Sequence, residues 1–352
     1  MIRRPKARRF LLIPALALAA TLVAAAPAMA CGGLVAPGHA EALEKAVTLS
    51  AWHAGYEHYI TGFQFAGSAD SFGYIIPLPG VPAKISKGGE WTLERVQSEI
   101  GEGPLAAQKR EDVALAAAAP RAGVQVLQQV KIEALDITVV RGGGPDVARW
   151  AGKNGFDLTP DTPKVLGSYS DKGAVFALAK FNRADAAQRG LIEGQGQVIQ
   201  FTIPTKAPWI PLRILALGKS GDELVDAELF VLTDDRPSFY PEIGTMQGMT
   251  VRADKAADGT LLTDLQRDTG MSWVPSSGMW FTALSLHTDA VNVTGDLAID
   301  GGGPVPSPTG RPIPVHLGWP FWIALIGGAA LLIREASRMR RRAERVRSTS
   351  RG

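Results

Sequence analysis

The residues with the most evident chemical potential lie around one short turn. His53 and His58 flank Ala54-Gly55, and Glu57 stands beside the second histidine. This spacing across a hairpin can bring two imidazoles onto one face, and a nearby carboxylate would complete a zinc-like set. Histidine is common at turns and strand edges, and the other three histidines lie in unrelated settings. We therefore predict no metal and no cofactor here.

Cys31 is the only cysteine of the 352 residues and directly follows Ala28-Met29-Ala30. A basic start and an apolar run precede these small residues, so residues 1–30 are predicted to be an export signal cleaved before Cys31. Two alternatives remain open: an exported hydrolase with Cys31 as N-terminal nucleophile, or a lipoprotein acylated at Cys31. Ala28 occupies the position where a lipobox usually has a leucine-like residue, which favours ordinary cleavage.

Arg213 lies inside the apolar segment Trp209–Leu215, for which a strand over 212–217 is predicted. A buried cation must be paired or reach solvent. Asp226 and Glu228 on the next predicted strand are the expected partners. We predict a structural ion pair at this point and assign no catalytic residue.

The C-terminal part of the chain has the pattern of a membrane anchor. Residues 301–316 are rich in proline and glycine and are predicted to be a solvated stalk. Residues 317–333 carry no charge, and tryptophans stand at their outer edge. Residues 334–352 contain eight arginines against two glutamates. This arrangement predicts one transmembrane helix at 317–333 in contact with the lipid bilayer, with a cytoplasmic Arg-rich tail.

The charge of the chain divides in the same way. The whole chain carries +3. Removing the five basic residues of segment 1–30, and the eight basic and two acidic residues of the tail, leaves 24 basic and 32 acidic residues. The middle of the chain is therefore at −8, and this acidic balance argues against nucleic acid as a partner.

Short apolar or alternating segments dominate the region between the signal and the stalk. They arrive in neighbouring pairs and outnumber helical segments by about two to one, which predicts an α+β ectodomain with β-dominated antiparallel sheets. A Gly- and Arg-containing stretch separates two β-rich halves, residues 31–182 and 183–300. The last two predicted strands, 279–286 and 291–299, are expected to form a closing hairpin.

Several stretches resemble one bacterial family. They are Cys31–Pro37, Phe72–Pro82 with Gly89–Leu93, Ala148–Ala151, Trp209–Leu215, Phe230–Pro237 and Leu261–Leu265. In their residues and in their order along the chain they are similar to the sequence blocks of the secreted or membrane proteins known as domain of unknown function 2330. The resemblance implies an exported, membrane-associated bacterial protein and assigns no catalytic residue.

No motif for a known enzyme class is found in the sequence. We therefore predict a single-pass protein of the cell membrane with its ectodomain outside the cytoplasm. Its expected role is a non-enzymatic surface module that binds an envelope protein or another cell-surface ligand. The exported hydrolase and the lipoprotein at Cys31 remain the alternatives.

Overall fold

A computed structural model describes residues 33–35, 46–64, 73–101, 114–115, 123–188, 196–206 and 208–300. The chain divides into two compact units, Met1–Thr309 and Gly310–Gly352, and every described residue belongs to the first. The predicted signal 1–30, Cys31, the stalk 301–316, the membrane helix 317–333 and the tail 334–352 lie outside the described residues. Within the described part, no helix is long and apolar enough to cross a membrane.

The larger sheet has seven strands in the order β14-β15-β12-β2-β3-β10-β5. Its strands are β2 (Ala46–His53), β3 (Tyr56–Gln64), β5 (Lys84–Lys87), β10 (Gly196–Pro204), β12 (Leu224–Thr233), β14 (Met249–Ala256) and β15 (Trp280–Asp289). All neighbours are antiparallel except β2 and β12, which run parallel. Strands from both predicted halves of the chain therefore share this sheet.

The second sheet has six strands in the order β1-β4-β9-β8-β7-β6, and all its pairs are antiparallel. Its strands are β1 (Gly33–Val35), β4 (Gly73–Leu78), β6 (Ala114–Leu115), β7 (Gln125–Ile132), β8 (Leu135–Arg141) and β9 (Val175–Phe181). A small third sheet has the order β11-β16-β13. It consists of β11 (Trp209–Ile210), β13 (Ser238–Tyr240) and β16 (Leu297–Asp300).

The helices are short. They are α2 (Glu90–Ser98), α3 (Gly144–Lys153), α4 (Thr162–Ser170), α5 (Arg183–Gln188) and α6 (Gly259–Arg267), with 3-10 turns η2 (Arg213–Ala216), η3 (Ile243–Thr245) and η4 (Ala290–Asn292). Single residues explain how two of these helices begin or pack. The Asp258 carboxylate caps α6 by accepting from the backbone N–H of Leu261 at 2.7 Å. Gly144 brings α3 onto α4, because a Cβ there would lie 2.0 Å from the backbone nitrogen of Gly167.

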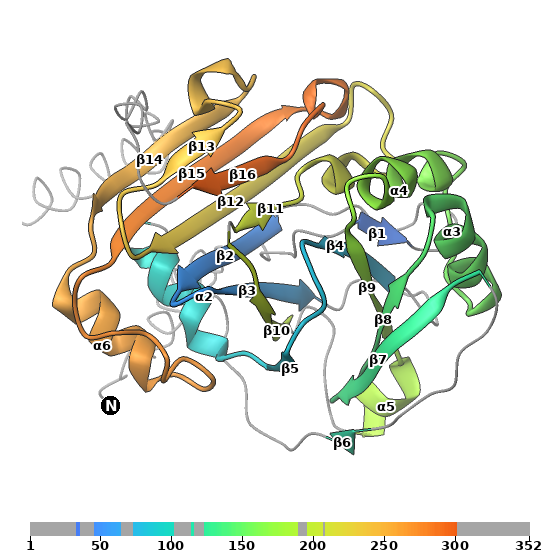
Figure 1. Ribbon diagram of the computed structural model, residues 1–352, viewed down its shortest axis with the longest axis horizontal. Coiled ribbons are helices and arrows are strands. Elements are labelled where there is room, and N and C mark those ends of the chain that lie inside the picture. The colour runs from blue at the N-terminus through green and yellow to red at the C-terminus, as the bar shows by residue number, and fades with distance from the viewer. Residues whose placement is uncertain are drawn as a thin grey trace, which may run out of the picture. The chain divides into compact units, whose positions relative to one another are not determined.

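The described residues are arranged in four layers (Figure 1). One core lies between the two large sheets and includes Tyr59, Phe201, Ile76 and Ala177. A second core packs α2 and α6 against the seven-stranded sheet, and a third packs α3 and α4 against the six-stranded sheet. Since the central strands are covered on both faces, nine of the ten residues of β12 are buried or half-buried.

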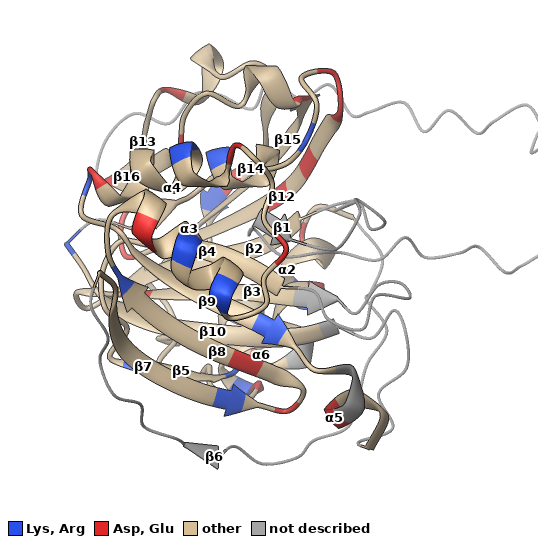
Figure 2. Cartoon of the chain, turned by 90° about the vertical axis from the view of Figure 1, so that its right-hand side faces the viewer, with Lys and Arg blue, Asp and Glu red and all other residues tan. Residues whose placement is uncertain are grey.

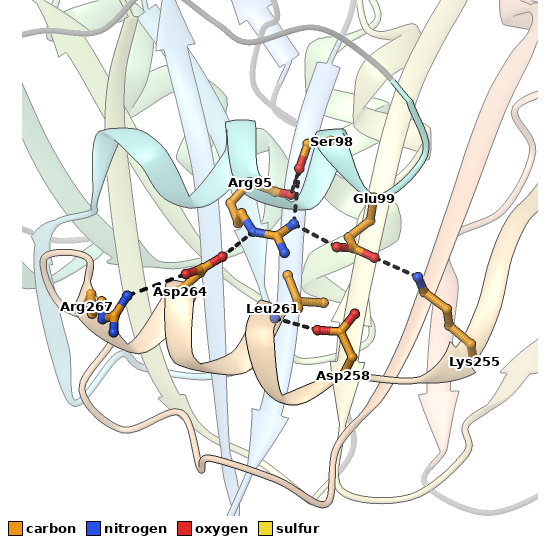
Figure 3. A network of polar contacts seen from close by, with 8 residues as sticks. All are labelled: Arg95, Ser98, Glu99, Lys255, Asp258, Leu261, Asp264 and Arg267. Atoms are coloured by element: carbon orange, nitrogen blue, oxygen red, sulfur yellow. Dashed lines mark hydrogen bonds and ion pairs between the residues drawn. The ribbon is translucent and has the colours of Figure 1, made fainter.

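A polar network fixes α2 to α6 and to β14 (Figure 3). The Arg95 guanidinium donates to Asp264 at 3.0 Å and to Glu99 at 2.7 Å, and Glu99 also accepts from Lys255 at 2.6 Å. Burial alone would raise the pKa of Glu99, but the hydrogen bonds from Lys255 and Arg95 outweigh it and hold that pKa below its usual value. The network therefore stabilises the helix layer as charged pairs.

Figure 2 shows the face that carries α3 and α4. Lys and Arg residues are interspersed there with Asp and Glu residues on the helices and on the strands beneath them. On α3, Arg149 pairs with Asp146 one turn away. This mixed pattern differs from the continuous basic tract that polyanion-binding proteins present.

The structure confirms the β-dominated class and corrects two local predictions. Residues 213–216 form the 3-10 turn η2 rather than a strand, because Pro211 lacks a backbone N–H for a ladder. The expected closing hairpin of 279–286 and 291–299 is also wrong. β15 pairs with β12 and β14, whereas β16 pairs with β11 and β13. One parallel pair, β2 with β12, makes the larger sheet mixed.

Candidate functional site

The turn between β2 and β3 positions His53, Glu57 and His58, the three residues weighed as a zinc-like set for which no metal is predicted. His53 pairs with Tyr56 across the hairpin, and Ala54 and Gly55 form the tip with φ of 51° and 86°. Side chains alternate between the two faces of a strand, so Glu57 and His58 point to opposite sides. Among the described residues, no group of three or more His, Cys, Asp or Glu side chains could hold a metal ion.

His58 lies on the face covered by the helices, against Trp273. The two rings are stacked with centroids 3.6 Å apart and planes 6° from parallel. In the amide orientation that satisfies both ends, the Gln200 oxygen accepts from His58 Nδ1 at 2.9 Å and from Trp273 Nε1 at 3.2 Å. Burial and the neighbouring His53 lower the pKa of His58 to about 4. His58 is therefore a neutral imidazole held as part of the packing.

We expect this buried imidazole to cost stability in acid. Its pKa is about 4 when folded and 6.5 when unfolded, so the folded state binds fewer protons and stability falls as pH drops through this interval. Allowing for partial solvent screening, the expected loss is about 2 kcal/mol. Measuring the free energy of unfolding of wild type and His58→Phe from about pH 7 to pH 4 checks this.

The Phe variant keeps a ring against Trp273 and has no titrating group at this position. The difference in free energy of unfolding between wild type and the variant should therefore become less favourable to wild type as pH falls. The same replacement at the exposed His287 is the control. A wild-type advantage that stays constant across the range would contradict a buried neutral His58.

His53 is held by a carboxylate that follows β12. Its Nδ1 lies 2.5 Å from Asp234 Oδ1, and the backbone N–H of Ala54 donates to the other Asp234 oxygen at 3.4 Å. About a third of each side chain is exposed, 33% for His53 and 32% for Asp234. The carboxylate therefore orients the imidazole and leaves Nε2 as the nitrogen not used in this pair.

Glu57 is fully buried on the opposite face, between the seven-stranded sheet and β11. Its Oε1 accepts from Ser50 Oγ at 2.6 Å and from the backbone N–H of Trp209 at 3.3 Å. Its Oε2 is buried without a hydrogen-bond partner in the described part of the chain. Burial raises the pKa of Glu57 to about 8, although the hydrogen bonds from Ser50 and Trp209 act against this rise. The carboxyl is consequently protonated at neutral pH.

Asp296 is a second buried carboxylate, and it anchors the segment that contains Arg213. Its Oδ1 accepts from Tyr169 Oη at 2.8 Å and from the backbone N–H groups of Leu212 and Arg213 at 3.1 Å each. Lys172 Nζ lies 3.7 Å from its Oδ2. Burial and the Asp296 charge raise the pKa of Tyr169 well above its usual value. This cluster joins α4, η2 and the approach to β16.

The three residues of the predicted ion pair take part in different contacts. Arg213 contributes its backbone N–H to Asp296. Asp226 lies 3.2 Å from His287 Nδ1 on the neighbouring strand. Glu228 accepts from Ser285 at 3.1 Å and lies 3.9 Å from Arg252. The carboxylates thus link β12 to β15 and β14 across one face of the sheet.

A family model described as an uncharacterized protein conserved in bacteria, DUF2330, matches residues 25–299. The chain belongs to this family. No curated relative matches the chain. Among solved structures, a mutated baculovirus P35 after caspase cleavage is 8% identical, with a TM-score of 0.40 over 73% of this chain and 99% of that chain. Baculovirus P35 itself is 9% identical, with a TM-score of 0.38 over 74% and 96%.

Sequence reasoning about this DUF2330 chain missed the partners of its histidines. Trp273 and Asp234 lie about 200 residues from the hairpin in the chain, and Asp296 had no distinguishing pattern. Asp234 did carry a signal, because it follows a predicted strand directly within a Thr-Asp-Asp-Arg-Pro turn. Nothing local to Trp273 or Asp296 pointed to either contact.

Proposed function

We propose that this DUF2330 protein is a membrane-tethered binding or interaction module on the outer side of the bacterial cytoplasmic membrane. One observation carries the proposal. The first compact unit ends at Thr309, inside the Pro- and Gly-rich stretch 301–316, and the apolar segment 317–333 and the Arg-rich tail follow it. A folded body followed by a spacer, an apolar span and a basic tail is the organisation of a tethered ectodomain.

The environments of Glu57, His58 and Asp296 favour a structural over a catalytic role for these three groups. Glu57 is fully buried between sheets, and His58 is packed under Trp273. Asp296 is committed to three hydrogen bonds within the fold. Catalytic acids and bases need access to a substrate, whereas these groups hold strands and turns together.

Reporter fusions test the proposed topology. Alkaline phosphatase, which is active only outside the cytoplasm, is fused after residue 300 or after residue 352 of the chain. We expect high activity for the first fusion and low activity for the second, with the reverse order for a green fluorescent protein reporter. Deleting 317–333 should move the chain from the membrane fraction to the soluble extracytoplasmic fraction. Equal phosphatase activities, or a chain retained in the cytoplasm, would overturn the proposal.

The same membrane preparation distinguishes the alternatives at Cys31. We expect the exported chain to have the intact mass of a polypeptide that begins at Cys31. An added diacylglycerol-sized mass would instead indicate the lipoprotein. An unmodified cysteine that reacts unusually fast with a thiol reagent would favour the N-terminal nucleophile.

A further inference from the structure

One exposed surface of the chain combines aromatic rings with a positioned imidazole. It lies at the end of the β2–β3 hairpin and consists of Tyr56, His53, Asp234 and Trp273, named here the hairpin-end surface. Tyr56 is 42% exposed and stands directly across from His53, so both side chains lie on the same face of the sheet. Trp273 is half-buried beside them, with its ring centroid 6.5 Å from that of His53.

The hairpin tip leaves this surface open. Ala54 and Gly55 are both exposed, and nothing lies within 4 Å of the position a Cβ on Gly55 would occupy. Ala54 nevertheless adopts a left-handed φ of 51°, a conformation that costs a non-glycine residue about 1 kcal/mol. Its N–H points to Asp234, the same carboxylate that holds His53. The tip is thus tied to the loop after β12 by one carboxylate.

The hydrogen-bonding capacity of the surface indicates what it can recognise. Asp234 accepts from His53 Nδ1 and from the Ala54 N–H, so each of its oxygens already has a hydrogen-bond partner within the fold. The pair with Asp234 leaves His53 Nε2 for a further hydrogen bond, and the Tyr56 hydroxyl both donates and accepts. Aromatic faces beside hydrogen-bonding groups match a ligand that presents C–H bonds on one side and hydroxyls at its edge.

Two other ligand classes fit this surface less well. An anionic polymer would meet a chain whose residues 31–333 carry 24 basic against 32 acidic residues. A cationic ligand would have to compete with the His53 ring and the Ala54 N–H for the Asp234 oxygens. We propose that the hairpin-end surface binds neutral saccharide, with a sugar ring lying on Tyr56 and a hydroxyl hydrogen-bonded to His53 Nε2. This inference rests on the proposed function, since it names the ligand class of that module.

Binding of defined oligosaccharides to the purified full-length chain tests the inference. The probes are cellotetraose and chitotetraose, with tetragalacturonate as the anionic comparison, followed by calorimetry and by tryptophan fluorescence. We expect saturable binding of at least one neutral probe and a change in fluorescence from Trp273. Tyr56→Ala and His53→Ala should each weaken binding about tenfold or more, whereas Tyr56→Phe should retain most of the affinity.

Tyr240→Ala is the matched control, because Tyr240 is a 57% exposed tyrosine on β13 in a different sheet. It should leave the dissociation constant within about twofold of wild type. The inference is overturned if a folded chain binds neither neutral probe, if tetragalacturonate binds as tightly, or if Tyr56→Ala leaves affinity unchanged. The detergent-purified chain is tested regardless of its topology in cells, so failure here is distinguishable from failure of the membrane proposal.

Discussion

Replacing Glu57 by Gln is expected to stabilise the protein in mild alkali and to leave its stability in acid almost unchanged. Glu57 titrates near pH 8 when folded and near 4.5 when unfolded, so the folded state binds more protons between these values. Stability contributed by the neutral carboxyl is therefore lost as pH rises through that window. The amide of the variant does not titrate. At about pH 9 the free energy of unfolding of the variant should therefore exceed that of wild type by up to about 5 kcal/mol.

Denaturant unfolding of wild type and Glu57→Gln at about pH 4, 7 and 9 measures this effect. Glu99→Gln is the matched control, because the same chemical change is made where hydrogen bonds from Lys255 and Arg95 keep the pKa low. Its effect should have the opposite sign: a loss of stability at neutral pH that diminishes in acid. A Glu57→Gln variant that is equally stabilised or destabilised at all three pH values would contradict a protonated buried Glu57.

Replacing Asp296 by Ala is expected to cost about 3 to 5 kcal/mol of unfolding free energy. The carboxylate accepts from Tyr169 and from two backbone N–H groups, and its side chain is only 4% exposed. Removing it leaves the Tyr169 hydroxyl and two backbone N–H groups without this acceptor and releases η2 from α4. Urea unfolding at neutral pH measures the change, and a loss below about 1 kcal/mol would contradict this role.

A double-mutant cycle isolates the part due to the Tyr169 hydroxyl. Tyr169→Phe removes one donor and should cost about 1 to 2 kcal/mol. In the Asp296→Ala background the same change should cost much less, because the hydroxyl no longer has that partner. Equal costs in both backgrounds would mean that the 2.8 Å contact contributes little.

Local sequence patterns were sufficient for most of the secondary structure. The hairpin expected around Ala54-Gly55 forms between β2 and β3. Alternating or apolar segments and turn residues are short-range signals, so they survive whatever packs around them. The segment 212–217 failed because an apolar run alone does not distinguish a strand from a buried 3-10 turn. In the fold, Pro211 offers no N–H to a ladder, and Asp296 holds the turn through the backbone N–H groups of Leu212 and Arg213.

Strand partners depended on information that no local pattern contains. β2 lies between its sequence neighbour β3 and the distant β12, and β16 joins a separate small sheet instead of pairing with β15. Pairing partners are chosen by burial of whole faces and by chain crossovers. For this reason the two β-rich segments before and after residue 182 contribute to one seven-stranded sheet.

The sequence by itself determined the strand-rich class, most element positions and the family of the matched region. It also named the residues of the hairpin, because turn chemistry and period-two alternation act over a few positions. Only the tertiary structure decided what those residues became. Glu57 and His58 are adjacent in the chain, yet one is a neutral acid between two sheets and the other a neutral base under a tryptophan. Burial set by distant segments, and not residue type, produced that difference.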